Sequence, residues 1–407
     1  MSLTVAMGAP TTAEADLSRL VVVGDSLSAG YQNGSLLASQ QASGYAARIA
    51  AQAGVGLALP LIAEPGIPNV LTLVDPGPPP IVAPAPGVST GRLDPSVVAT
   101  NVAVPGATVH DALARRPDFP IDSLTDLVLG LPGLFLGVSQ SQVEWAEALA
   151  PTTVVVWLGA NDALAAVIAA DPALVTPLAD FTAAYRAALA RLAATGARLV
   201  VANLPDITVI PFLTPAGSVG AMVEAQTGVP AWIVLSLLGL EAGDFVTPDA
   251  FALVPAILGN PGAGPLPGSV VLTADEAATI QSAVTDFNAV IADAAAAHGA
   301  AFVDIRALLA GAAQDGIVVG GQRLTTGYLG GFFSLDGIHP TDTGYAIVAN
   351  AFIHALNTTF GTDVPRVNVR DVQRDDALVL PGVGHPAASL AHPSPATAAA
   401  LRAVLGR

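Results

Sequence analysis

Thr152–Leu158 reads Thr-Thr-Val-Val-Val-Trp-Leu and is the strongest strand signal in the chain. A continuous run of β-branched residues is typical of a strand that is buried on both faces. The polar turn Gly159–Asp162 follows this run directly. Similar apolar runs that predict further strands lie at 20–23, 198–203 and 300–305, with a weaker candidate at 97–104.

Helical patterns lie between these runs. Apolar residues recur at three- and four-residue spacing over 44–53, 181–195, 274–298 and 341–356. The alternation of strands and helices predicts a parallel sheet covered on both faces. In such sheets ligands bind at the carboxyl ends of the strands, so we examined those ends for chemistry.

Two stretches interrupt the alternation, and we expect both to be insertions in one domain over 17–360. The first, at about 55–97, includes Glu64–Gly87, whose eight prolines predict an absence of regular structure. The second, 206–273, is apolar and rich in Gly and Pro. It either extends the core or lines a pocket or forms a lid. Residues 361–407 are expected to form a tail that packs on the domain or is partly extended.

The net charge of −17 comes with no lysine, so all fifteen basic side chains are arginine. A nucleic acid or an anionic membrane needs a positive surface, so this balance argues against both partners. The absence of cysteine excludes disulfides, thiolate nucleophiles and cysteine-ligated metals. With 52% hydrophobic residues the chain can still bury a sizeable core.

The first sixteen residues are small and lack a basic start or a long apolar run, so they are not an intact signal peptide. Their small-residue composition is typical of the residues that remain after a signal peptide has been cleaved. It predicts a secreted, periplasmic or lipoprotein-anchored bacterial protein, with a cytoplasmic location as the alternative. The longest uncharged apolar stretch, Ala225–Leu240, is too short for a transmembrane helix and contains Pro230. Nothing in the sequence indicates the oligomeric state.

Four short polar blocks lie at the predicted strand ends or just before a helix. They are Gly24–Ser28 after the first strand, Asn101–Gly106, Gly159–Asp162, and Asp336–Pro340 before the last helix. Taken singly, each block is better explained by a turn or a helix cap. A doubly wound sheet, however, brings such blocks to one edge, so they have to be interpreted together.

Together the blocks contain the groups that acyl transfer needs. Ser26 offers a nucleophilic hydroxyl, and His339 offers an imidazole that titrates near neutral pH. Asp336, three residues before the histidine, can orient the ring. The Asn161 amide and the backbone N–H groups of Ser26 and Gly106 can hold an oxyanion.

The four blocks, in this order, resemble the GDSL or SGNH hydrolase superfamily, and the chain looks like a large bacterial member with insertions. The resemblance implies a three-layer α/β/α, flavodoxin-like fold with a doubly wound parallel sheet of about five strands. It implies a catalytic triad of Ser26, Asp336 and His339 and an oxyanion hole of Ser26, Gly106 and Asn161. It implies no metal and no cofactor.

Several other residues are candidates for a role in or near the site. Gly87–Gly91 matches the Gly-x-Ser-x-Gly elbow at Ser89, but nearby prolines leave no strand before it, so this alternative is weak. His110 is close enough in sequence to the Gly106 block to lie near the cleft. Asp162 is expected to cap the next helix or fix its turn, and Asp25 to give structural support. His385 and His392 lack the partners of a metal site.

The sequence therefore predicts a carboxylic-ester hydrolase, an esterase or lipase of the GDSL type, acting through an acyl-enzyme. Its expected substrate is a small-molecule or lipid-like ester, because apolar insertions suit such groups. Two alternatives stay open: an acyltransferase with the same triad, and a non-catalytic binding module on the same fold.

Overall fold

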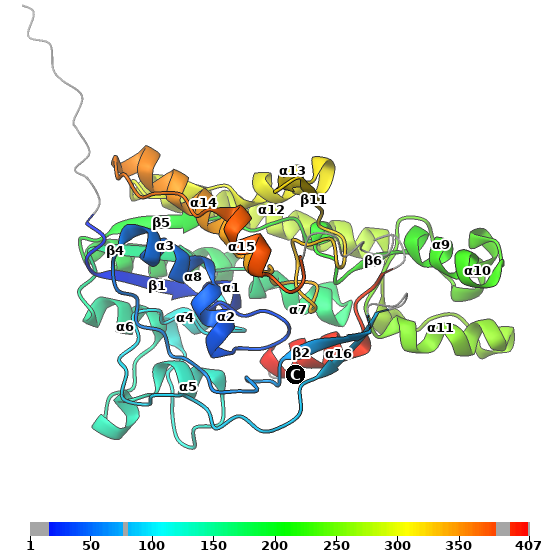
Figure 1. Ribbon diagram of the computed structural model, residues 1–407, viewed down its shortest axis with the longest axis horizontal. Helices are drawn as coiled ribbons and strands as arrows, with labels where there is room; N and C mark the ends of the chain where they lie inside the picture. Colours follow the sequence, from blue (N-terminus) through cyan, green and yellow to red (C-terminus); the bar gives the residue numbers. More distant parts are fainter. Residues whose placement is uncertain (1–15, 76–79, 380–390, 406–407) are drawn as a thin grey trace, which may run out of the picture.

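The central sheet of the computed structural model has four parallel strands in the order β1-β4-β5-β9 (Figure 1). The structure describes residues 16–75, 80–379 and 391–405. Every residue of β1 and β4 is buried, as their continuous apolar runs predict. The strands are β1 (Leu20–Gly24), β4 (Thr153–Trp157), β5 (Arg198–Ala202) and β9 (Ala301–Val303).

The weak strand candidate at 97–104 pairs with β1 only irregularly. Val22 donates its N–H to Thr100 O and accepts one from Val102, and its bridge partner is Asn101. The Asn101 side chain bonds Ser28 O and the Ala103 N–H, which bends the segment away from a regular ladder. With this segment beside β1, the chain order across the sheet is 2-1-3-4-5, the flavodoxin-like arrangement.

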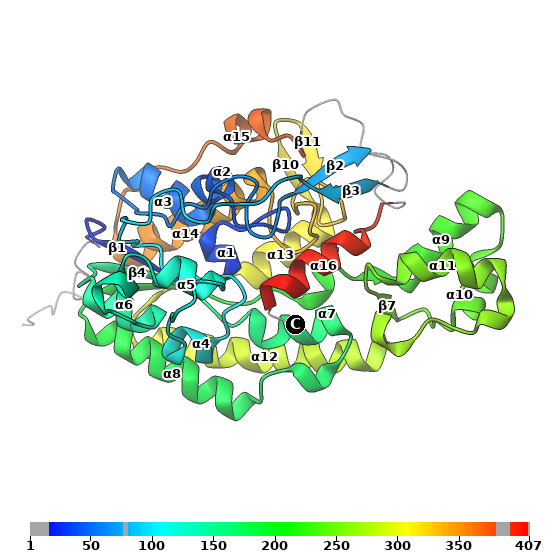
Figure 2. The ribbon, with the colours of Figure 1, turned by 90° about the horizontal axis from the view of Figure 1, so that it is seen from below.

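Helices cover both faces of the sheet and confirm the three-layer fold (Figures 1 and 2). One layer contains α3 (Tyr45–Ala53) and α14 (Asp342–Phe360), which pack together. The other contains α6 (Gln142–Ala148), α8 (Leu178–Ala194) and α12 (Ala274–Ala297). Further elements are α1 (Ser26–Ala29), α2 (Ala38–Ser43), α4 (Val109–Ala114), α5 (Leu124–Leu129), α7 (Asn161–Ala169), α13 (Ile305–Asp315), β10 (Ile317–Val319) and β11 (Gln322–Leu324).

The prediction that 64–87 has no regular structure is wrong. The segment contains β2 (Leu71–Asp75) and β3 (Ile81–Pro84), which pair antiparallel. Of the eight prolines, the hairpin strands include only Pro84, at the end of a two-stranded edge where a missing N–H is tolerated. The number of prolines was a poor guide here, because most of them lie outside the two strands.

The second insertion folds around its own apolar cluster, so the expectation that it extends the main core is largely wrong. Residues 207–213 do join that core, through Ile207, Ile210 and Phe212. Leu272 also belongs to the main core, and Phe245 packs against it. Most of the remaining apolar residues form a separate cluster around fully buried Val234 and Leu238. Its elements are α9 (Ala216–Thr227), α10 (Ala231–Leu238), α11 (Ala250–Gly259), β6 (Thr214–Pro215), β7 (Phe245–Val246) and β8 (Val271–Leu272).

The C-terminal part of the chain returns across the domain. Helix α15 (Val369–Asp375) packs on α14, and α16 (Pro395–Leu405) contacts α7, β3 and α11. Figure 2 shows α16 crossing the molecule between the β2–β3 hairpin and α7. Among the described helices none is long and apolar enough to span a membrane alone; α9 and α10 pass that test only as a pair bent by 118°.

Candidate active site

Ser26 begins helix α1 directly after β1, so the strand end aims it at the edge of the sheet. Asp25 caps this short helix by accepting the Leu27 N–H at 3.0 Å. Gly24 is required at the turn, because a Cβ there would lie 2.2 Å from Ser28 Oγ and 2.9 Å from Trp157 O. The turn at Gly24 is therefore packed closely between the end of β4 and helix α1.

Ser26, His339 and Asp336 form a continuous hydrogen-bonded chain. His339 Nε2 lies 2.8 Å from Ser26 Oγ, and His339 Nδ1 lies 3.0 Å from Asp336 Oδ2. Asp336 also accepts the backbone N–H groups of Ile338, His339 and Gly34. All three catalytic candidates are buried, with Ser26 only 5% exposed.

The surroundings keep Asp336 ionised. Burial alone raises the pKa of its carboxyl, but the attraction of His339 and the hydrogen bonds from His339 and Gly34 outweigh burial and lower the pKa overall. The ring of Tyr31 packs at 4.7 Å from the imidazole and shields one side of it. Burial, followed by the charge of Asp336, raises the pKa of Tyr31, so this hydroxyl stays neutral. An anionic Asp336 favours the tautomer of His339 that can accept a proton from Ser26.

The oxyanion-hole candidates lie on the loops after the neighbouring strands. Gly106 has a φ of 81°, a conformation that favours glycine. Asn161 begins α7 and donates its Nδ2 to Ala107 O at 3.0 Å, which ties the two loops together. Within the described residues, the Ser26 and Gly106 amide N–H groups donate to no acceptor. Both are therefore available to a developing negative charge.

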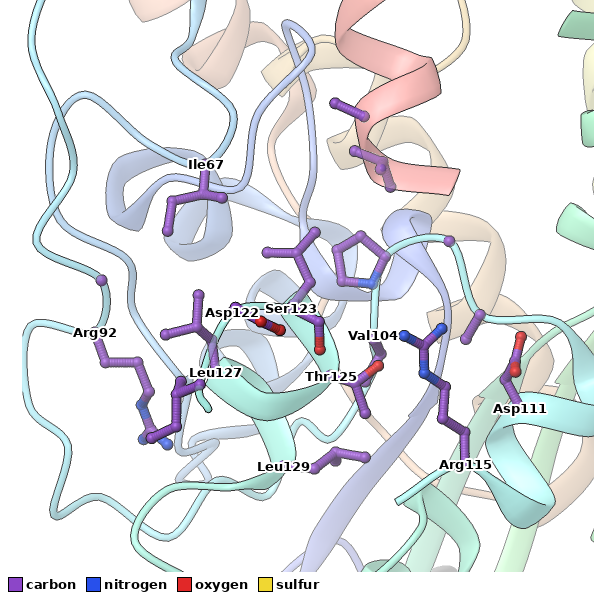
Figure 3. Close-up of a pocket in the computed structure, with 18 of the residues that line it drawn as sticks. Ile67, Arg92, Val104, Asp111, Arg115, Asp122, Ser123, Thr125, Leu127 and Leu129 are labelled. Carbon is purple, nitrogen blue, oxygen red and sulfur yellow. The ribbon is translucent and has the colours of Figure 1, made fainter. Parts of the chain in front are cut away.

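A cleft of about 990 Å³ opens beside Gly106 and Asn161 (Figure 3). Its wall is mixed: Leu127 and Leu129 are apolar, whereas Arg115, Asp122 and Ser123 are polar. A smaller apolar cavity of about 70 Å³ is lined by residues next to the candidates in sequence, namely Leu27, Ala160 and Ile338. It is also lined by Ile207 and Ile210, so the insertion does contribute to a pocket wall, one of the alternatives for this stretch.

The other residues considered from sequence lie outside this constellation. Ser89 Oγ donates to Ala63 O and has no histidine partner in the part of the chain that the structure describes, which argues against the elbow alternative. His110 is exposed on α4 and is absent from the cleft lining. Asp162 does not cap its own helix; it accepts the Val109 N–H at 3.0 Å, the first N–H of α4, whose N-cap is Thr108. His385 lies outside the described residues. Among the described residues, no group of three or more His, Cys, Asp or Glu side chains could hold a metal ion.

Three parts of the site were missed from sequence. Tyr31 packs on His339, and the Gly34 N–H binds Asp336, yet both lie in a loop with no catalytic signature. Asp25 gives the expected structural support by capping α1, but nothing local in the sequence indicates that its Oδ2 is buried without a hydrogen-bond partner among the described residues. Leu405, at the end of α16, lines the cleft although it is nearly 300 residues away from Gly106 in the chain. These contacts depend on tertiary packing, so no local sequence pattern predicts them.

The chain is similar to several solved structures at low sequence identity. An α/β hydrolase enzyme from the metagenome of Lake Arreo, Spain, is 15% identical, with 86% of this chain and 98% of that chain covered and a TM-score of 0.39. A variant of an acetyl xylan esterase from Geobacillus stearothermophilus is 13% identical, covering 84% and 96%, with a TM-score of 0.40. Phospholipase A1 from Streptomyces albidoflavus is 16% identical, covering 84% and 100%, with a TM-score of 0.37.

Comparison with curated proteins found no match. The family model of GDSL-like lipases and acylhydrolases, by contrast, matches residues 20–352. That span begins at β1, contains all four polar blocks and ends within α14. The chain belongs to the family of GDSL-like lipases and acylhydrolases and is a serine ester hydrolase.

Proposed function

We propose that the chain hydrolyses carboxylic esters through an acyl-enzyme on Ser26. Ser26 Oγ attacks the ester carbonyl carbon while His339 Nε2 takes the hydroxyl proton. The N–H groups of Ser26 and Gly106 and the Asn161 amide hold the resulting oxyanion. The observation that carries this proposal is the 2.8 Å contact between His339 Nε2 and Ser26 Oγ, with Asp336 behind the ring.

In the remaining steps His339 acts first as an acid and then again as a base. His339 gives its proton to the leaving alcohol as the tetrahedral intermediate collapses, and the acyl group stays on Ser26. His339 then takes a proton from water, whose oxygen attacks the acyl carbonyl. Collapse of the second intermediate releases the acid and returns the proton to Ser26 Oγ. The complete hydrogen-bonded chain supports catalysis rather than a purely binding role.

The test is Ser26→Ala, measured against wild type on p-nitrophenyl esters from acetate to palmitate. Loss of the nucleophile should reduce turnover by at least about 10³-fold, because binding and oxyanion stabilisation alone remain. The thermal unfolding midpoint should change little, since the substitution removes only one hydroxyl. Labelling of wild type, but not of the variant, by a fluorophosphonate provides a second readout. Undiminished hydrolysis by Ser26→Ala would contradict the proposal.

A further inference from the structure

The C-terminal segment 391–405 lies outside the span matched by the family and runs along the rim of the candidate active site. Thr397 Oγ1 donates to Leu335 O at 3.1 Å, one residue before Asp336. A Cβ placed on Gly337 would lie 3.3 Å from Pro393 Cγ. The segment is therefore packed directly against the turn that carries Asp336 and His339.

The last turn of α16 reaches the oxyanion-hole candidate on the other side of the site. A Cβ placed on Gly106 would lie 2.7 Å from Val404 O and 3.3 Å from Val404 Cγ1. Val404 thus touches the backbone of the glycine whose N–H has no acceptor among the described residues. Ala403, Val404 and Leu405 line the cleft together with Gly106 and Asn161, and Figure 3 shows the end of this helix above the cleft.

Two contacts hold α16 in this position from the side of the insertion. Arg402 Nη1 lies 2.6 Å from Asp249 Oδ2, next to the start of α11. The rings of His392 and Phe251 stack at 3.4 Å with an angle of 7° between their planes. These contacts place α16 and the residues just before it against the insertion, while Ala403, Val404 and Leu405 form part of the cleft wall.

An ester bound for attack by Ser26 places its carbonyl oxygen on the Gly106 N–H. One of the two groups attached to that carbonyl must then pass Val404 to enter the cleft, because Val404 occupies the space beside Gly106. The volume of about 990 Å³ is at the upper end for small-molecule sites. Leucines combined with hydroxyl and charged side chains suit a large group that has both apolar and hydrogen-bonding atoms.

We propose that α16 is part of the substrate site, and that Val404 and Leu405 determine how large an amphipathic group of the ester can enter the cleft. This proposal rests on the proposed hydrolysis of esters at Ser26. It makes the C-terminal helix a determinant of specificity rather than a structural appendage.

The experiment compares Val404→Phe and Val404→Ala with wild type on two ester series. One series enlarges the acyl group, from p-nitrophenyl acetate to decanoate, and the other enlarges the alcohol, from phenyl acetate to 2-naphthyl and biphenyl acetates. The measured quantity is the ratio of kcat/KM for the largest to the smallest ester in each series. In at least one series Val404→Phe should lower this ratio by about tenfold or more, and Val404→Ala should raise it by about threefold or more. Effects of this size are expected when a pocket wall changes by a few methylene groups.

Ala399→Phe is the matched control, because it adds the same ring to an exposed position of the same helix. Its ratios should stay within about twofold of wild type. If Val404→Phe does not fold, as judged by circular dichroism, Val404→Ala and Leu405→Ala decide the question, since both only remove atoms. Ratios within twofold of wild type for all folded Val404 and Leu405 variants would overturn the role of α16 and leave ester hydrolysis standing. A wild type that hydrolyses none of these esters would overturn the proposed function itself.

Discussion

Two buried carboxylates, Asp25 and Asp336, lie close to His339 and are driven in opposite directions by their surroundings. Asp336 accepts three backbone N–H groups and faces the imidazole, and its pKa is lowered. Asp25 accepts one N–H, and its other oxygen has no partner. Burial raises the pKa of Asp25 to about 7, against smaller lowering effects from the Leu27 hydrogen bond and from His339. The site thus lowers the pKa of Asp336, which orients His339, and raises the pKa of Asp25, which caps the helix that begins with Ser26.

The raised pKa of Asp25 has a consequence for stability. A group whose pKa is higher in the folded than in the unfolded state stabilises the fold at low pH, and that contribution is lost as pH rises. For Asp25 the loss should extend from about pH 4 to about pH 7. Asp25→Asn removes the titration and keeps an oxygen for the Leu27 N–H. We therefore expect the free energy of unfolding to fall less between pH 4 and pH 8 in Asp25→Asn than in wild type, by about 2–4 kcal/mol.

Urea unfolding at pH 4, 6 and 8 measures this difference. The comparison is one of slopes, so any constant effect of the amide on stability cancels. Asp162, whose pKa burial raises to about 6, titrates in both proteins, and its charge contributes to the raised pKa of Asp25. Parallel pH profiles for wild type and Asp25→Asn would show that Asp25 does not titrate in this range.

At the scale of elements, helix α12 holds the loop that follows β5. Asn288 on α12 accepts the Leu204 N–H and donates to Leu204 O, both at 2.8 Å, and the pair is buried. Leu204 lines the small apolar cavity beside the candidate site. The helix itself begins with a reciprocal cap between Thr273 and Glu276. A side chain in the middle of a long helix therefore replaces the backbone partners that the loop lacks.

Asn288→Ala should lower the free energy of unfolding by about 2–4 kcal/mol, because it leaves a buried N–H and a buried carbonyl of Leu204 without partners. Chemical denaturation measures the change. Asp286→Ala, at an exposed position on the same helix, is the control and should cost less than about 0.5 kcal/mol. A loss below 1 kcal/mol for Asn288→Ala would mean that water or another group replaces both hydrogen bonds.

The elements that could be predicted are those whose signal is local. The β-branched run at 152–158 and the apolar spacing at 274–298 correspond to β4 and α12 within two residues at each end. Ser26, Asp336 and His339 stood out because acyl transfer needs these residue types at strand ends, and the structure brings them within hydrogen-bond distance, although their catalytic roles stay predictions. The β2–β3 hairpin was missed because its two strands are short and stand in a stretch where prolines lie between and around them, so no periodic pattern marks the pairing.

On the scale of the whole molecule, the described chain has a main core around the sheet, a second core in the insertion and a smaller cluster around Leu71, Tyr328 and Leu335. The second cluster packs α9, α10 and α11 around residues such as Val234. The insertion projects from the body in Figure 1, so much of its surface faces solvent. Segments with a small separate core open at lower free energy than the main core.

Hydrogen exchange should show this division. We expect amides of α9 and α10 to exchange faster than those of β1, β4 and β5. Val234→Ala, a cavity-forming change in the second core, should speed exchange in the insertion while leaving the sheet unchanged. Val155→Ala is the matched control in β4 and should speed exchange throughout, because it weakens the main core. Equal acceleration of both regions by Val234→Ala would show that the two cores unfold as one unit.

The ion pair between Arg402 and Asp249 connects the C-terminal helix α16, which lines the cleft, to the insertion with its separate core. Arg402 lies two residues before Val404 on α16, and Asp249 immediately precedes α11 in the insertion. If an ester binds against α16 as proposed, a ligand of the insertion that favours the observed position of α16 strengthens ester binding. By thermodynamic reciprocity, the ester then strengthens binding of that ligand by the same free energy. Both partners are partly exposed, so the ion pair alone transmits less than about 1 kcal/mol and loses strength in salt. The coupling free energy between the insertion and the cleft at α16 should therefore decrease as ionic strength rises.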